Sequence, residues 1–204
     1  MVKTITLKWL QSKGACKESL EAWQKETDHN TFATLNRLVS KNPEWGNWLI
    51  CRLMNKKQAV QYAIFAAEQV IDIYEGKYTD KRPRNAIEAA KAYLKNPSKK
   101  TKAYAADAGY AATYAAGYAA TYAAGYGAGY AATYAAAAAA YAAASAYAAG
   151  YDAAAAATYA ADAAGYAAAD AAGAYAAGAE RRKMKAKILK YGIGLLEQSR
   201  KEKV

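Results

Sequence analysis

Residues 110–133 read YAATYAAGYAATYAAGYGAGYAAT, and tyrosine returns at every fourth position from Tyr110 to Tyr134. This run lies inside a longer Ala/Tyr tract, Ala103 to Ala179, in which 45 of 77 residues are alanine and 14 are tyrosine. Alanine is the strongest helix former because it loses no rotamer freedom, and a four-residue spacing keeps neighbours on one side of a helix. The tract is therefore predicted to be helical.

The same repeat predicts that the tract is not one straight rod. Each step of four residues over-rotates by about 40° on an α-helix, so the tyrosines would wind around its axis. Gly125, Gly127 and Gly129 interrupt the run, and each glycine costs about 1 kcal/mol relative to alanine. We expect a break there and a second one at Gly150, with Asp152 capping the next helix. The tract should form two or three helices folded against each other.

The tyrosines of the tract have two interpretations. Alanine faces let helices approach closely, and tyrosine rings fill space while their hydroxyls reach water. We therefore expect them mainly to pack between helices. The alternative is an exposed tyrosine ladder that contacts a ligand or partner. Alanine-faced helices are also compatible with a homo-oligomer. A membrane span is not expected, because the tract contains the acidic residues Asp107, Asp152, Asp162 and Asp170.

The net charge of +11 is unevenly distributed along the chain. The tract carries four aspartates and no lysine or arginine, so it contributes −4 and the flanking sequences contribute +15. Basic flanks suit an acidic protein or a nucleic acid, although solvated lysine-rich helix faces are the commoner cause. The basic character therefore belongs to the two ends.

The chain has too few candidate ligands for a zinc site. Its two cysteines, Cys16 and Cys51, are not in a CxxC pair, and His29 is the only histidine. Zinc sites need about four nitrogen or sulfur ligands. Two free thiols point to a reducing cytoplasm, and the first residues lack the apolar run of a signal peptide. We expect a cytoplasmic protein without a metal or cofactor.

Apolar residues recur at helical spacing on both sides of the tract, and no stretch alternates like a strand. We predict an all-α fold. An N-terminal multi-helix domain should span residues 1–97. A bundle of long Ala/Tyr-rich helices, ending in a basic helix from Glu180, should span residues 98–204. Residues 58–75 are expected to form one central helix ending at Gly76, and Gly192 and Gly194 are expected to weaken the last helix.

Two basic clusters are candidate partner-binding sites. Arginine and lysine side chains on one loop can hold a phosphate or a carboxylate, but they can also pair with nearby carboxylates such as Asp80 or Glu88 and fix the loop. The tail cluster is either a solvated helix face or a contact for a nucleic-acid backbone. The candidate residues are Lys81, Arg82 and Arg84 in the loop, and Arg181, Arg182, Lys183 and Lys187 in the tail.

The sequence contains no recognisable arrangement of catalytic residues. Nucleophilic catalysis needs a serine or cysteine beside a base, and His29 lies in a predicted turn. No phosphate-binding glycine motif follows a strand. The tyrosines lie in the acidic part of the chain and the lysines outside it, which disfavours simple single-strand binding. We expect a protein that is not an enzyme.

The first hundred residues combine GAC at 14–16, a tryptophan-containing helix, EWGNWLICRLM at 44–54 and DKRPRNAIEAAKAYL at 80–94. This succession resembles the Imm5-like immunity proteins of bacteria and phages over about residues 4–95. The matching positions are Ala15, Cys16, Trp23, Trp45, Trp48, Leu49, Arg52, Leu53, Asp80, Arg82, Pro83, Arg84, Ala86, Ile87 and Glu88.

The resemblance implies a non-enzymatic helical protein that binds and neutralises a protein toxin or a defence effector, as an immunity or phage counter-defence factor. Immunity proteins against nucleases tend to be acidic, so a charge of +11 fits an acidic partner or a nucleic acid better. The alternative is a nucleic-acid or nucleotide binder that sequesters a signal molecule or coats a polymer through basic and tyrosine-rich surfaces.

Overall fold

The computed structural model describes residues 4–121, 128–149, 151–172 and 176–202. Regular structure in these ranges is helical, apart from one isolated antiparallel bridge between Thr4 and Asn30. The predicted all-α fold is confirmed. The helices of the described ranges are α1 (Leu7–Ser12), α2 (Lys17–Gln24), α3 (Thr31–Lys41), α4 (Pro43–Leu53), α5 (Lys56–Glu68), α6 (Ile71–Glu75), α7 (Arg82–Lys95), α8 (Lys99–Thr121), α9 (Ala128–Tyr147), α10 (Tyr151–Ala172) and α11 (Ala177–Lys201).

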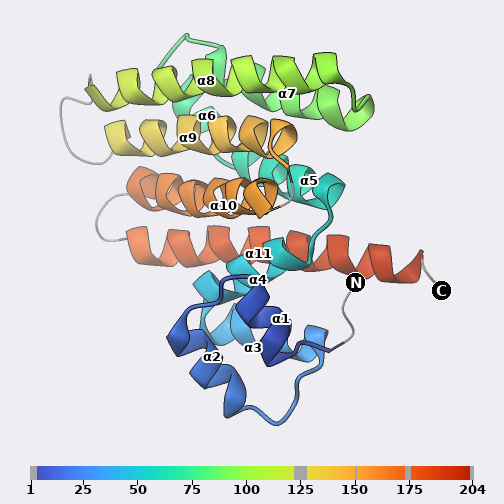
Figure 1. The fold of residues 1–204 in the computed structure, drawn as a ribbon. Helices are drawn as coiled ribbons and strands as arrows, with labels where there is room; N and C mark the ends of the chain where they lie inside the picture. The colour runs from blue at the N-terminus through green and yellow to red at the C-terminus, as the bar shows by residue number, and fades with distance from the viewer. Residues whose placement is uncertain (1–3, 122–127, 150, 173–175, 203–204) are drawn as a thin grey trace.

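The four long helices α8, α9, α10 and α11 lie side by side in one layer, in chain order (Figure 1). Helices α5, α6 and α7 pack against this layer, with contacts to α9 from all three. Helix α4 contacts α10 and α11, and α1, α2 and α3 lie beyond it (Figure 1). None of the described helices is long and apolar enough to cross a membrane.

Alanine forms the contact surface between the long helices. Its methyl group lets helix backbones approach closely, and α9 has neighbours on both sides and behind it. Along α9, Ala135, Ala139, Ala142 and Ala146 have no exposed surface. Buried residues of the tract and of the N-terminal helices form one continuous hydrophobic cluster. The tract is therefore folded back onto the N-terminal helices.

Several helix ends lie where local signals predict them. Gly14 follows α1 with a φ of 73°, in the left-handed region that favours glycine. The side chains of Asn30 and Asn42 accept hydrogen bonds from the first turns of α3 and α4. The hydroxyl of Ser98 accepts a hydrogen bond of 3.1 Å from the Thr101 N–H at the start of α8. These ends are set by short-range chemistry.

The break predicted near Gly150 is confirmed, because residues 148–149 are not helical, whereas the break predicted at Gly125 and Gly127 lies outside the described residues. Helix α8 ends at Thr121 and α9 begins at Ala128, whereas α9 ends at Tyr147 and α10 begins at Tyr151. Gly125, Gly127 and Gly150 lie outside the described residues, and Gly129 falls inside α9. Asp152 lies in the first turn of α10 instead of capping it, so that prediction is wrong.

Residues 58–75 are two helices, not the single one predicted. Helix α5 begins earlier, at Lys56, because the side chain of Asn55 accepts a hydrogen bond from the Gln58 N–H and that of Gln58 accepts one from the Asn55 N–H. It ends at Glu68, and α6 begins at Ile71. Between them Val70 has φ −132° and ψ −4°, which departs from helical geometry. The predicted stop at Gly76 is observed as the end of α6.

The basic tail helix α11 is continuous through Gly192 and Gly194, so the predicted weakening of its last turns does not interrupt the helix. Gly192 instead allows a close helix contact. A Cβ atom at this position would lie 2.7 Å from Cε2 of Tyr62 and 2.8 Å from Cγ2 of Ile50. Helix α11 can therefore approach α4 and α5 this closely only with glycine at position 192.

The two cysteines should differ in reactivity. Cys16 is exposed, whereas Cys51 is buried in α4, and burial raises the pKa of its thiol to about 12. Because the thiolate is the nucleophile, we expect iodoacetamide at mildly alkaline pH to modify Cys16 and leave Cys51 unmodified. Peptide mass spectrometry after brief labelling measures this, with labelling in denaturant as the control that should modify both. Equal labelling of both thiols in the native protein would contradict it.

Candidate functional site

Tyrosine rings are paired across the layer of long helices. The ring centroids of the pairs lie 5.2 to 6.3 Å apart. One pair joins α8 to α9, and two join α9 to α10. We define the tyrosine face as these six residues: Tyr110 with Tyr147, Tyr134 with Tyr166, and Tyr141 with Tyr159.

The exposed members of the tyrosine face point away from the core, whereas Tyr134 is half-buried and packs against it. On α9, the neighbours α8 and α10 cover the sides and α5, α6 and α7 cover the back, so its exposed positions must face outward on the remaining side. Tyr141 of α9 is 38% exposed, and its ring partner Tyr159 of α10 is 55% exposed. The face is therefore an open aromatic surface on the layer.

The expectation that the tyrosines mainly pack between helices is wrong for these exposed residues. Tyr110 is 63% exposed and Tyr114 is 74% exposed, and Tyr130 is also exposed. The reason is that closely spaced alanine-lined helices leave no room between them for an aromatic ring. The alternative interpretation, an exposed tyrosine ladder, is the one observed. Tyr134, at the end of the ladder, is half-buried and packs against the core as expected. The side chains of Tyr118, Tyr122 and Tyr126 lie outside those that the structure describes.

A groove of about 210 Å³ lies on this face between α8 and α9. The rings of Tyr110, Tyr141 and Tyr147 line it, and alanines, Gly109 and Thr113 complete the lining. Burial raises the pKa of the Tyr147 hydroxyl. A protonated tyrosine hydroxyl can donate a hydrogen bond as well as accept one.

Arg181 extends the tyrosine face to a fourth helix. Its guanidinium carbon lies 4.1 Å from the ring centroid of Tyr166, a cation–π contact between α11 and α10. The same guanidinium lies 3.7 Å from the Glu44 carboxylate. Of the other tail candidates, Arg182, Lys183 and Lys187 are exposed, and Lys183 lies 3.7 Å from Glu180. Arg181 is thus the tail candidate that the structure brings to the face.

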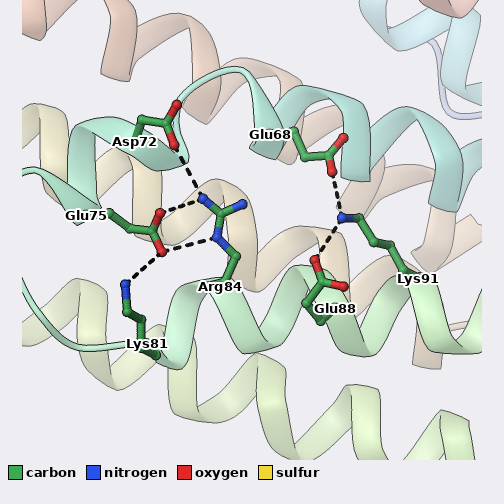
Figure 2. A network of polar contacts seen from close by, with 7 residues as sticks. All are labelled: Glu68, Asp72, Glu75, Lys81, Arg84, Glu88 and Lys91. Carbon is green, nitrogen blue, oxygen red and sulfur yellow. Dashed lines mark hydrogen bonds and ion pairs between the residues drawn. The ribbon is translucent and has the colours of Figure 1, made fainter.

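The loop candidates form ion pairs within the chain (Figure 2). Arg84 donates to Glu75 at 3.1 Å through Nε and to Asp72 at 3.3 Å, which links α7 to α6. Its hydrogen bond holds the pKa of Glu75 below the ordinary value. Lys81 lies 3.4 Å from the same Glu75 and remains largely exposed, with 65% of its side chain accessible.

Arg82 is held by the neighbouring Asp80. Its guanidinium donates to Oδ2 at 2.6 and 2.8 Å and to Oδ1 at 3.1 Å, and this contact holds the pKa of Asp80 below its ordinary value. About two helical turns beyond Arg84 on α7, Lys91 lies 2.8 Å from both Glu68 and Glu88 (Figure 2). The arginines therefore fix the α6–α7 connection, which agrees with the interpretation that they pair with nearby carboxylates of the chain.

A buried polar cluster that the sequence analysis missed joins α4, α10 and α11. Lys185 is only 3% exposed, and its Nζ lies 2.9 Å from Oε1 of Glu44 and 3.0 Å from Oδ1 of Asp162. The hydrogen bond from Lys185 holds the pKa of Glu44 below its ordinary value. This lysine therefore bridges the N-terminal helices and the tract.

Asn47 continues the cluster into the core. Its Nδ2 donates to the Thr158 carbonyl and to Asp162, each at 3.2 Å. Its Oδ1 accepts a 2.8 Å hydrogen bond from the hydroxyl of Tyr62.

The sequence contains one signal that Lys185 is buried. Lys185 precedes Ile188 by three residues and Gly192 by seven, which places it on the buried side of α11.

The described residues contain no group of three His, Cys, Asp or Glu side chains that could hold a metal ion. In the wider comparison, no protein-family model, curated protein or solved structure matches the chain. The function proposed below therefore rests on the chain's own sequence and geometry.

Proposed function

We propose that this chain is a non-enzymatic binding protein that captures a protein partner on the tyrosine face, as an immunity or counter-defence factor neutralising a toxin or defence effector. The observation that carries the proposal is the open surface of paired tyrosines bordered by Arg181. Tyrosine and arginine are enriched among the residues that dominate binding energy in protein interfaces. The resemblance of residues 4–95 to immunity proteins supports the neutralising role.

The surface is pre-organised for binding. The tyrosines stand on rigid helices whose alanines are buried, and each ring of the face contacts another ring. Tyr166 is held on both sides, by Tyr134 at 5.2 Å and by Arg181 at 4.1 Å. Less side-chain entropy is then lost on binding, which leaves more of the contact energy as affinity.

The charges around the face favour a protein over a nucleic acid. Asp152 lies seven residues before Tyr159 and Asp170 four residues after Tyr166, so both share the outward side of α10. Carboxylates there repel phosphates, and no lysine or arginine occurs from residue 103 to residue 179. The tyrosine face thus suits a neutral or basic partner surface, although the net charge of the whole chain favoured an acidic one.

The double variant Y141A/Y159A should lose the partner. Both side chains are exposed and alanine is a strong helix former, so we expect a native fold with binding weakened at least about tenfold, as for central interface residues. The partner is recovered with the tagged protein from the native host and titrated in purified form. The matched control is Tyr104→Ala, which removes a tyrosine that is 50% exposed and lies outside the tyrosine face.

Three outcomes would overturn the proposal. One is equal partner affinity for wild type and Y141A/Y159A. Another is recovery of nucleic acid or nucleotide in place of a protein, with affinity that falls steeply as salt rises. The third is self-association that Y141A/Y159A abolishes in sedimentation, with no foreign protein bound, because the face would then be an interface between copies of this chain.

A further inference from the structure

A second potential site lies where α1, α2, α3 and α4 meet α10. It is a cavity of about 350 Å³, within the size range of small-molecule pockets. Its walls are mainly apolar and aromatic, and its principal lining residues are Leu10, Trp23, Leu38, Trp45, Trp48 and Leu49. The residues of the tyrosine face do not line it, so it is separate from the proposed partner surface.

Two buried polar groups at this cavity have no hydrogen-bond partner within the described residues. They are Nε1 of Trp23 and Oγ1 of Thr34. Thr34 is 5% exposed, so it is more than nine-tenths buried, and both residues line the cavity. Native proteins leave few buried donors unsatisfied, because each has lost its hydrogen bonds to water. A molecule in the cavity with an acceptor atom beside these groups would supply the hydrogen bonds that they lack.

The charged groups of the cavity wall are already paired. Glu26 lies 3.2 Å from Arg37, and Glu44 and Asp162 share Lys185. An anionic molecule would meet three carboxylates, and a cationic one would compete with Arg37 and Lys185 for partners already held. The wall therefore offers a neutral molecule the best match.

We propose that this cavity binds a neutral, flat aromatic molecule that carries a hydrogen-bond acceptor. The rings of Trp23, Trp45 and Trp48 supply aromatic contact area. The indole N–H of Trp23 and the hydroxyl of Thr34 donate to the acceptor. The cavity shares no lining residue with the tyrosine face, so each site is tested by its own probes and variants.

Calorimetric titration of the full chain with four probes tests the chemistry. Coumarin is flat and neutral and has a carbonyl acceptor. Naphthalene keeps the shape without an acceptor, N-methylquinolinium adds a positive charge, and coumarin-3-carboxylate adds a negative one. We expect coumarin to bind at least about tenfold more tightly than the other three, the effect of one or two added hydrogen bonds. No binding of coumarin, or equal or tighter binding of any of the other three, would overturn the proposal.

A matched pair of threonine variants tests the position. Thr34→Val should weaken coumarin binding about three- to tenfold and leave naphthalene binding unchanged. Because its hydroxyl has no described partner, this variant should unfold at no lower temperature than wild type. Thr158→Val is the control in the same cavity, since the Thr158 hydroxyl already donates to the Ala154 carbonyl at 2.9 Å. Equal weakening of coumarin binding by the two variants would mean that the Thr34 hydroxyl does not donate to the acceptor, and it would contradict the proposal.

Discussion

Replacing Lys185 with methionine is expected to lower the free energy of unfolding by about 2 kcal/mol. The lysine side chain is 4% exposed and serves two carboxylates, Glu44 and Asp162. Methionine keeps most of the volume but leaves both carboxylates without this cation. Removing one member of a fully buried pair costs about 3–5 kcal/mol. The expected loss is smaller because 58% of the Glu44 side chain and 32% of the Asp162 side chain are exposed to water.

Lys187→Met is the matched control for this measurement. It removes the same charge two residues away, at an exposed position of α11, and should change stability by no more than about 0.5 kcal/mol. Urea unfolding at neutral pH compares both variants with wild type. Adding Asp162→Asn to Lys185→Met should recover part of the loss, because one uncompensated charge disappears. If Lys185→Met proves as stable as Lys187→Met, the cluster does not stabilise the fold.

Helix positions were predictable because their signals are local. Gly14, Asn30 and Asn42 act within one turn of the helices that they end or begin, so a short stretch of sequence contains both the cause and the effect. The prediction of a single helix over residues 58–75 was wrong because its break has a long-range cause. Its apolar residues fit one continuous helix, but the change in backbone direction at Val70 lets α6 pack against α9. That contact depends on residues far along the chain.

The candidate site was harder to predict because it depends on the distance between helices. Periodicity shows that tyrosines share a side of a helix, but not whether that side is covered. Close alanine packing decides this, and it turns the rings outward. The contacts of the buried cluster follow no local pattern, since Glu44 and Lys185 are 141 positions apart and Asn47 and Asp162 are 115 apart. The spacing of Lys185 from Ile188 and Gly192 indicates that it lies on the buried side of α11, but it does not identify its partners.

The cluster connects the two proposed sites physically. Glu44 and Asp162 belong to the wall of the tryptophan-lined cavity. Glu44 also lies 3.7 Å from Arg181, whose guanidinium covers Tyr166 of the tyrosine face. The same ionic contacts that hold α4 against α10 and α11 therefore set the position of one cavity wall and of one edge of the tyrosine face.

Gly192→Ala and Gly194→Ala should change stability in opposite directions. Both glycines lie inside α11, where alanine improves helix propensity by about 1 kcal/mol. Nothing lies within 4 Å of a Cβ atom at position 194, so Gly194→Ala should stabilise by about 0.5–1 kcal/mol. At position 192 the new methyl would meet Tyr62 at 2.7 Å and Ile50 at 2.8 Å, and we expect a net loss of about 1–3 kcal/mol.

Thermal and urea unfolding of the two variants separates helix propensity from packing. Propensity alone predicts that both substitutions stabilise the protein. A loss of stability in Gly192→Ala alone would show that the close packing of α11 against Tyr62 and Ile50 excludes a side chain at position 192. Because Tyr62 also donates to Asn47 at 2.8 Å, displacing its ring would disturb the polar cluster and add to the loss. Equal stabilisation by both substitutions would contradict the close approach of α11 to α4 and α5.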